Sequence, residues 1–326
     1  MNRYIDLIQQ TFDFPTKEFT VEDNQLYFNG VNLMEIIETY GTPLKLTYLP
    51  KISENIQHAK TYFKNAMETH NYQGKYTYCY CTKSSHFSFV LDEALKNDIH
   101  IETSSTFDIP LVRSLYAKGK IRKDTYIICN GFKREKYKQY VSELLNDGFV
   151  NCIPILDNLT EIDYYLEHVT VPFQVGIRIA SDEEPKFGFY TSRLGVRYND
   201  IISLYEEKIK NNPQVSLKML HFFINSGIKD TAYYWSELTR FIQKYVELKR
   251  VAPSLDSMDI GGGWPIKTNV FFDYDYQYMA DQIVKNIKWM CAKNSTKEPN
   301  IFTEFGSYTV GESGAVLYSI LEEKLQ

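Results

Sequence analysis

The stretch YTYCYCTKSSHFSFVLDEALKNDIHIETS (76–104) decides the fold, because it holds a strand, a helix and a second strand in one run. Residues 76–83 are rich in β-branched and aromatic side chains, as strands are, and residues 87–97 place apolar side chains at helical spacing. Residues 100–104 again have the composition of a strand. Two parallel strands need a crossover connection such as this helix. The stretch therefore predicts parallel βα units.

The same alternation continues along the rest of the chain. Strand-like runs lie at residues 76–83, 100–104, 125–131, 151–157, 173–179, 216–224, 254–262 and 300–306. Eight strands that alternate with helices over about 250 residues are typical of an α/β fold of the (β/α)8 TIM-barrel type. A doubly wound open sheet is the alternative. It is less favoured because no G-x-G-x-x-G segment follows the first strand.

The first 45 residues do not follow this alternation. Residues 19–50 predict short strands, a helix at LMEIIETY (33–40) and one more strand. We therefore expect residues 1–45 to form a small N-terminal appendage and residues 46–326 to form the barrel. After the eighth strand, a helix is predicted from about Gly311 to the end of the chain.

The bulk composition disfavours several classes of protein. A chain of 326 residues with 44% hydrophobic and 15% aromatic residues can bury a large core. A net charge of -5 and a pI near 5.8 give no basic surface for a nucleic-acid partner. No apolar run approaches the roughly 20 residues that span a bilayer, and the start lacks the layout of a signal peptide. We expect a cytoplasmic protein without a membrane partner.

The cysteines predict neither disulfides nor a metal site. Cys79, Cys81, Cys129, Cys152 and Cys291 form an odd, scattered set, and most of them lie in strand-like apolar runs. Such cysteines are expected to be reduced, buried thiols. A zinc site would need a second cysteine pair or well-spaced histidines, and the sequence offers neither.

A lysine at the end of the first strand is the first candidate for chemistry. In a barrel of this type, side chains at the carboxyl ends of the strands face the active site. Lys83 ends the first run, and the alternation of side chains places Cys79 and Cys81 on the same face. Two small thiols beneath a lysine suit a crowded barrel interior. A solvated lysine at a strand end is the alternative.

A glycine turn is the second candidate. Gly261, Gly262 and Gly263 end the seventh run, and three glycines allow backbone N–H groups to approach an anion closely. A tight turn is the alternative. Phosphate sites in barrels are often built by the loops after strands seven and eight, which favours a phosphate site here.

Carboxylates at two strand ends are further candidates. Glu304 lies near the end of the eighth run, where a buried carboxylate needs a cationic or protonated partner. A bound pyridine nitrogen would serve, and a salt bridge to Arg178 on the fifth strand is an equal alternative. Glu102 and Asp108 flank the end of the second strand, where Asp108 has the spacing of a helix cap.

The end of the sixth strand supplies possible cofactor contacts. Ser226 could contact a phosphate, and Phe223 could stack on an aromatic ring, although most phenylalanines in strands fill a core. His221 is predicted to be a buried core histidine.

Six segments, in this order, resemble the motifs of the fold-type III pyridoxal-phosphate decarboxylases. This family contains the ornithine, diaminopimelate and barrel-type arginine decarboxylases and is related to alanine racemase. The family patterns are Y-G-T-P-L-Y-V-Y, Y-A-x-K-A-N, a second-strand motif, H-x-H-x-G-S, D-I-G-G-G and E-P-G-R-Y-x-V. The matching segments are YGTPLKLTY (40–48), YCTKSS (80–85), IETSSTFD (101–108), HFFINSG (221–227), DIGGGWP (259–265) and TEFGSYTVGESG (303–314). The sequence is most similar to a short bacterial branch of arginine decarboxylases.

The resemblance implies pyridoxal 5'-phosphate as the cofactor and assigns roles to the candidate residues. Lys83 would hold the cofactor in a Schiff base, and Glu304 would pair with its pyridine nitrogen. Gly261–Gly263 and Ser226 would surround its phosphate, and Arg178 would lie near it. The implied reaction is α-decarboxylation of a basic amino acid, foremost arginine to agmatine for polyamine biosynthesis, by a homodimer of the full-length protein.

The resemblance leaves other functions open. Diaminopimelate, ornithine or carboxynorspermidine decarboxylation and racemisation would use the same cofactor. A catalytically silent regulatory homologue is an alternative of another class. Asp182, Glu183 and Glu184 are candidates for binding a guanidinium group, because its planar donors match carboxylates, although an exposed acidic loop is the plainer interpretation.

The chain departs from the family pattern in three places. Phe223 stands where relatives stack a histidine on the pyridine ring, and a phenyl ring can stack but cannot form hydrogen bonds. Ser307 stands where relatives place an arginine at the phosphate, which removes a charge-assisted contact. Motifs of the C-terminal β-domain, which would pack with the appendage, do not appear in the sequence. We therefore expect a truncated chain without that domain.

Overall fold

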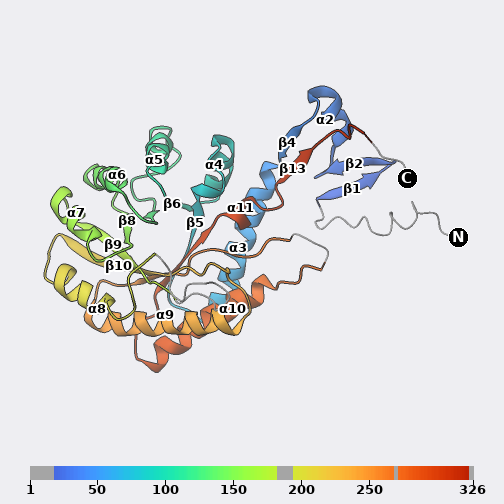
Figure 1. Cartoon of the computed structure of the whole chain (residues 1–326). Helices are drawn as coiled ribbons and strands as arrows, with labels where there is room; N and C mark the ends of the chain where they lie inside the picture. The colour runs from blue at the N-terminus through green and yellow to red at the C-terminus, as the bar shows by residue number, and fades with distance from the viewer. Residues whose placement is uncertain (1–17, 182–193, 268–270, 323–326) are drawn as a thin grey trace.

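Eight parallel strands close into a barrel in this computed structural model, which describes residues 18–181, 194–267 and 271–322 (Figure 1). Around the barrel the strand order is β10-β11-β12-β5-β6-β7-β8-β9. The strands are β5 (Tyr76–Cys81), β6 (His100–Thr103), β7 (Ile127–Cys129), β8 (Cys152–Leu156), β9 (Phe173–Arg178), β10 (Val215–His221), β11 (Ser257–Asp259) and β12 (Asn300–Phe305). The predicted (β/α)8 barrel is confirmed, and each strand lies within or overlaps one of the runs identified in the sequence.

Helices follow the strands and cover the outside of the barrel (Figure 1). Two of the longest begin at side-chain caps: Thr231 accepts a hydrogen bond from the Tyr234 backbone N–H at 3.1 Å, and Asp275 accepts one from that of Tyr278 at 2.8 Å. Each such cap stabilises a helix by about 1 kcal/mol. The helices are α3 (Leu49–Thr69), α4 (Ser88–Leu95), α5 (Asp108–Ala117), α6 (Glu135–Asn146), α7 (Glu161–His168), α8 (Ile201–Leu204) with a π-helical continuation at Tyr205–Ile209, α9 (Ala232–Val251), α10 (Tyr276–Lys293) and α11 (Ser307–Val310).

The alternation of side chains along the strands divides the core into two layers. One large cluster lies between the strands and the helices and includes Tyr78 and Tyr80 of β5. A separate cluster fills the inside of the barrel with Cys79, Ile128, Ile153, Ile155, Met219 and Phe302. This interior is packed with side chains, so a ligand can enter only above it, at the carboxyl ends of the strands.

An appendage of short strands stands apart from the barrel and is joined to it by α3 (Figure 1). It contains β1 (Phe19–Glu22), β2 (Gln25–Phe28), β3 (Val31–Asn32), α2 (Leu33–Tyr40) and β4 (Leu44–Thr47), so the predicted strands and helix are confirmed. Phe28 and Leu33 form its small core. A domain boundary between residues 45 and 46 stays a prediction, and β4 spans that point.

The helix predicted from Gly311 onward is wrong. Gly314–Leu317 instead forms strand β13, which pairs antiparallel with β4 and places Ala315 in the core of the appendage. The pairing partner lies almost the whole chain away, so a local sequence pattern could not reveal it. The chain thus returns from the barrel to the appendage after α11.

The five cysteines are all free and buried, as predicted. Cys129 and Cys152 lie on neighbouring strands with their sulfur atoms 3.7 Å apart. Within the described residues, no helix combines the length and the apolar character needed to cross a membrane.

Candidate active site

Lys83 lies at the mouth of the barrel, just beyond the end of β5. The strand ends at Cys81, two residues earlier than predicted, and Lys83 sits in the 3-10 turn Thr82–Ser84. Its Nζ lies 3.6 Å from Oε2 of Glu102 and 3.4 Å from Oγ of Ser104. Burial lowers the pKa of Lys83, but the carboxylates of Glu102 and Glu304 and the thiol of Cys81 outweigh it, so this pKa is raised. Lys83 therefore rests as an ammonium group.

A cavity of about 240 Å³ lies beside Lys83 and brings several predicted residues together. Lys83, Arg178, Phe223 and Glu304, which come from four different parts of the barrel, all line it. Phe223 is half-buried, and its ring centroid lies 5.8 Å from the guanidinium carbon of Arg178. Asn130 also lines the cavity. A space of this size, with a lysine, an arginine, a carboxylate and an aromatic ring on its walls, is suited to a charged aromatic ligand.

Glu304 is held as a buried carboxylate inside this cavity. The Nδ2 group of Asn130 lies 3.0 and 3.1 Å from its two oxygens, and Nε2 of His221 lies 3.3 Å from Oε2. Burial raises the pKa of Glu304, but His221, Lys83 and Arg178 together lower it below its usual value. Glu304 therefore keeps a negative charge and can face a protonated ring nitrogen.

A second carboxyl group lies next to Glu304 and is kept neutral. Burial and the charge of Glu304 raise the pKa of Asp259 well above its ordinary value, although the backbone N–H of Gly261 donates to Oδ1 at 2.8 Å. Two negative charges this close together in a buried site would repel each other strongly. One carboxyl group, Asp259, therefore stays protonated while Glu304 is charged. No role was predicted for Asp259.

The glycine turn packs directly against the strand that carries Glu304. A Cβ on Gly262 would lie 2.1 Å from the carbonyl oxygen of Glu304, so only glycine fits there. Gly261 and Gly263 have φ angles of +68° and +98°. Gly263 accepts a hydrogen bond from the backbone N–H of Ile228 at 3.1 Å, which ties this turn to the turn that contains Ser226. The predicted phosphate-binding segments are therefore neighbours.

The structure also places the other residues that the sequence analysis singled out. His221 is fully buried, as predicted, but it also contacts Glu304 and so belongs to the site. The capping box predicted for Asp108 forms only in part: Oδ2 accepts hydrogen bonds from the backbone N–H groups of Ser104 at 3.0 Å and Ser105 at 2.9 Å, but the N-cap residue of α5 is Phe107, which makes no side-chain cap hydrogen bond. Ser307 is exposed at the start of α11. The candidates for guanidinium binding, residues 182–184, lie outside the described residues.

Asn130 was missed by the sequence reasoning, and Glu102 was noted but given no role. Both stand where predicted strands end, so the strand-end rule that selected Lys83 could have found them. Glu102 is fully buried, which a position at a strand end does not by itself reveal.

Three buried side chains of the site have the composition of a metal-binding group. Ligand atoms of His221, Asp259 and Glu304 all lie within 4.8 Å of one another. However, Glu304 and His221 contact Asn130, and Asp259 accepts from Gly261. These side chains are thus already used within the protein, and they hold the charge of Glu304 in place.

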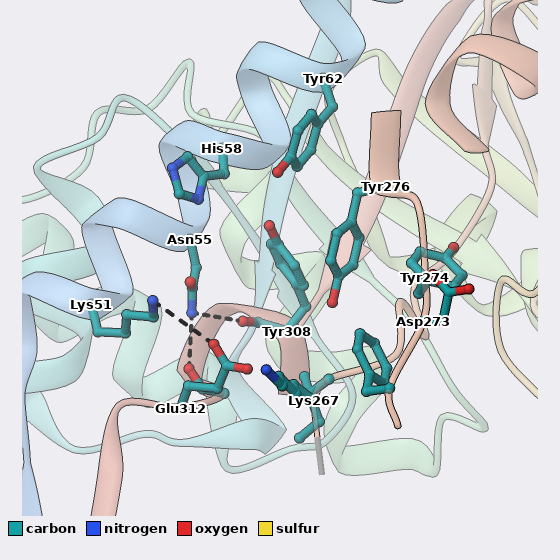
Figure 2. A pocket seen from close by; sticks show the side chains of 13 residues that line it. Lys51, Asn55, His58, Tyr62, Lys267, Asp273, Tyr274, Tyr276, Tyr308 and Glu312 are labelled. Atoms are coloured by element: carbon teal, nitrogen blue, oxygen red, sulfur yellow. Dashed lines mark hydrogen bonds and ion pairs between the residues drawn. The ribbon is translucent and has the colours of Figure 1, made fainter. Parts of the chain in front are cut away.

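A second cavity, of about 340 Å³, shares no lining residue with the cavity beside Lys83. Figure 2 shows tyrosines of α3, α10 and α11 around it, and the rings of Tyr62 and Tyr276 are stacked with centroids 5.9 Å apart. Asn55 donates from Nδ2 to the carbonyl oxygens of Tyr308 at 3.1 Å and Gly311 at 2.9 Å. These contacts fix the segment that leads from the barrel back to the appendage.

The barrel and its lysine-containing cavity fit a pyridoxal cofactor. Lys83 offers an amine, Glu304 a charge for the ring nitrogen, and the glycines of the adjoining turns let backbone segments approach one another where a Cβ would collide. These features define a (β/α)8 protein of the class that holds pyridoxal phosphate on a lysine. The family model described as "Pyridoxal-dependent decarboxylase, pyridoxal binding domain" matches residues 53–311, and the chain belongs to this family.

The curated relatives that the chain resembles are named biosynthetic arginine decarboxylases. The chain is 25% identical over 301 residues to the biosynthetic arginine decarboxylase of Prochlorococcus marinus (strain MIT 9515), a match that covers 86% of this chain and 46% of that protein. The similar match to biosynthetic arginine decarboxylase 2 of Synechocystis sp. has 22% identity over 332 residues and covers 93% of this chain and 50% of that protein. The chain thus spans about half the length of these curated relatives.

Solved structures share the fold. The biosynthetic arginine decarboxylase of Campylobacter jejuni superposes with a TM-score of 0.75 at 19% identity, covering 90% of this chain and 51% of that one. The diaminopimelate decarboxylase of M. jannaschii, solved in complex with L-lysine, gives 0.79 at 17% identity, covering 93% and 69%. At these identities the likeness concerns the fold.

Proposed function

We propose that this chain forms the cofactor-binding barrel of a pyridoxal-phosphate-dependent decarboxylase that removes the α-carboxylate of a basic amino acid. The observation that carries the proposal is the cavity in which Lys83 and the charged Glu304 face the same space. Lys83 would attach the cofactor through Nζ, and Glu304 would face its ring nitrogen. Phe223 would lie against its ring, and Arg178 near it.

The two glycine-containing turns would hold the phosphate of the cofactor. Gly261, Gly262 and Gly263 lie in one turn and Ser226 in the other, and a hydrogen bond joins the two turns. Backbone N–H groups in such turns bind anions without a charged side chain. This suits a chain in which Ser307 occupies the place of an arginine.

The bound cofactor would supply an electron sink for the bond broken at Cα. The protein's own part is to fix charges around it. Asn130 and His221 hold Glu304 in its charged form, which keeps a facing ring nitrogen protonated. Lys83 provides the amine, and Phe223 covers one wall of the cavity, where it excludes water.

Arginine is the substrate that we favour, with agmatine as the product and polyamine biosynthesis as the role. The support is that curated relatives from Prochlorococcus marinus and Synechocystis sp. are named biosynthetic arginine decarboxylases. The second candidate is diaminopimelate, supported by the fold match to a diaminopimelate decarboxylase. Ornithine and carboxynorspermidine are further candidate substrates, because the same cofactor chemistry would decarboxylate them. If the protein is instead a catalytically silent regulatory homologue, it will release no carbon dioxide from any of these amino acids.

A homodimer in the cytoplasm is part of the same proposal. Aromatic side chains that follow three neighbouring strands, Phe87, Phe107 and Phe132, are exposed by 55%, 87% and 62%. Exposed rings gathered near the mouth of a barrel favour a protein partner there. Sedimentation of the purified protein measures its oligomeric state directly. A Phe107→Asp substitution should shift the equilibrium from dimer towards monomer.

Two experiments test the proposed function. Purified protein mixed with pyridoxal phosphate should develop a visible absorbance band, and borohydride should fix the label on Lys83 in peptide mass spectra. Lys83→Ala should abolish both the absorbance band and the borohydride label. Lys83→Arg keeps the positive charge without the amine and so tests whether charge alone retains the cofactor. Release of carbon dioxide from arginine, diaminopimelate, ornithine and carboxynorspermidine then identifies the substrate. A band that survives in Lys83→Ala would show that the assignment of Lys83 is wrong.

A further inference from the structure

A second carboxylate in the Lys83 cavity has no part in the function proposed above. Glu102 is the last but one residue of β6, its side chain is 0% exposed, and it lines the same cavity as Lys83. Its Oε2 atom makes no hydrogen bond within the described residues, and the Nζ of Lys83 lies 3.6 Å away. A fully buried carboxylate is costly unless a cation pairs with it, and the ammonium group of Lys83 is the cation that lies next to this oxygen.

A hydrogen-bonded chain connects the two side chains through a serine. Nζ of Lys83 donates to Oγ of Ser104 at 3.4 Å, and Oγ of Ser104 donates to Oε1 of Glu102 at 2.6 Å. The hydroxyl group of Ser104 thus accepts a hydrogen bond from Lys83 and donates one to Glu102. A hydroxyl group in this position can pass a proton from the ammonium group to the carboxylate.

The surroundings separate the two carboxylates of the cavity. Burial and the negative charge of Glu304 raise the pKa of Glu102 to about 7, whereas the pKa of Glu304 is lowered. Several elements supply the groups that interact electrostatically with Glu102. They are Cys79 and Cys81 on β5, Lys83 in the turn after it, Ser104 after β6, Tyr137 on α6, Asp259 on β11 and Glu304 on β12. Paired carboxyl groups with divergent pKa values commonly divide into a proton carrier and a fixed charge.

We propose that Glu102 is the base that deprotonates Lys83, with Ser104 as the positioning residue between them. This inference rests on the proposed function, because it concerns how Lys83 becomes able to bind the cofactor. An N–H bond of the ammonium group breaks and its electron pair stays on Nζ. One proton passes to Oγ of Ser104, whose own proton passes to Oε1 of Glu102. The free amine then adds to an aldehyde carbon, and the condensation releases one water.

A purely electrostatic role for Glu102 predicts the opposite effect of mutation. The negative charge of Glu102 is one of the causes that raise the pKa of Lys83. If charge were its only contribution, Glu102→Gln would lower that pKa, increase the fraction of free amine and make Lys83 react faster with an aldehyde. Loss of a base makes Lys83 react more slowly. The sign of the change therefore separates the two roles.

Reductive methylation measures the reactivity of Lys83 without the cofactor. Purified protein is treated with formaldehyde and cyanoborohydride, which supplies the hydride, and the rate of methylation at Lys83 is read from peptide mass spectra between pH 5.5 and 9. The wild-type rate should rise with a midpoint near pH 7, the pKa of Glu102. Glu102→Gln should react roughly 100-fold more slowly at pH 7.5 and lose this midpoint, within the range typical of general-base catalysis.

Two further variants complete the test. Glu207→Gln removes an exposed carboxylate elsewhere on the barrel and should react like the wild type. Ser104→Ala keeps the carboxylate but removes both hydrogen bonds of the chain, so it should react more slowly, and its midpoint should lie above that of the wild type because the Ser104 hydroxyl lowers the pKa of Glu102. If circular dichroism shows that Glu102→Gln is unfolded, the rate measured for Ser104→Ala decides the test instead. An unchanged or faster rate in the folded Glu102→Gln protein, or in Ser104→Ala when it stands alone, would overturn the proposal.

Pyridoxal phosphate serves as a second label on the same proteins. If Lys83 is methylated with the expected pH dependence but takes no pyridoxal label, the proposed function fails and the role of Glu102 stands. If both reagents label Lys83 equally well in wild type and Glu102→Gln, the role of Glu102 fails and the proposed function stands.

Discussion

A buried ion pair behind the active site should be among the strongest single determinants of stability. Nζ of Lys133 lies 2.9 Å from Oε1 of Glu161, and the two side chains are 0% and 1% exposed. Lys133 also donates to the carbonyl oxygens of Gly131 at 3.0 Å and Ile155 at 2.6 Å. The pair thus ties α7 to the loop that carries Asn130, next to Glu304.

Removal of either partner leaves a buried charge without compensation. Lys133→Met preserves most of the aliphatic stem, and Glu161→Gln preserves the shape of the side chain, so both changes act mainly on charge. We expect each to lower the free energy of unfolding by about 3–5 kcal/mol. The double variant Lys133→Met/Glu161→Gln should lose less than the sum of the two, by roughly 0.5–3 kcal/mol, because no lone charge remains.

Urea unfolding followed by tryptophan fluorescence measures these differences at constant pH. The matched control is an exposed ion pair of the same helix: Asp163 of α7 lies 2.6 Å from Lys208 of the π-helical segment, and their side chains are 54% and 28% exposed. Lys208→Met should therefore cost less than about 1 kcal/mol. The reasoning is refuted if Lys133→Met costs no more than Lys208→Met, because burial would then not govern the strength of the pair.

Three further predictions concern the walls of the cavity. Gly262→Ala places a Cβ 2.1 Å from a backbone oxygen, so it should lower the free energy of unfolding in urea by at least about 1–3 kcal/mol. In the control Gly314→Ala the nearest atom to the new Cβ is 3.7 Å away, so stability should change little. Equal losses in the two variants would contradict the packing argument. Phe223→Ala should weaken pyridoxal phosphate binding roughly tenfold in absorbance titrations while Phe223→His is tolerated, and equal affinities of wild type and Phe223→Ala would rule out stacking. Glu102 has a pKa of about 7 when folded against 4.5 ordinarily, so the folded state binds more protons and loses stability as the pH rises from about 4.5 to 7. Glu102→Gln removes this loss, so its stability relative to wild type should increase between pH 5 and pH 7.5 in urea unfolding; a constant difference would mean that Glu102 titrates normally.

The sequence by itself determined the barrel and the framework of its site. Parallel βα units repeat locally, so eight runs could be located without knowledge of their neighbours, and the end of a strand is a local feature that already marked Lys83, Gly261–Gly263 and Glu304. Chemistry carried by residue type, such as the conformational freedom of glycine, is visible in the same way. Burial of the five cysteines followed from their apolar surroundings.

Only the tertiary structure decided what depends on segments far apart in the chain. Residues 314–317 form a strand because β4 supplies the partner, although their own pattern favoured a helix. Asn130 acquires its role because β7 and β12 bring it to Glu304 from 174 residues away. The charge states differ for the same reason: Glu102 and Glu304 are chemically alike, and only the side chains that the fold places around each one drive their pKa values apart.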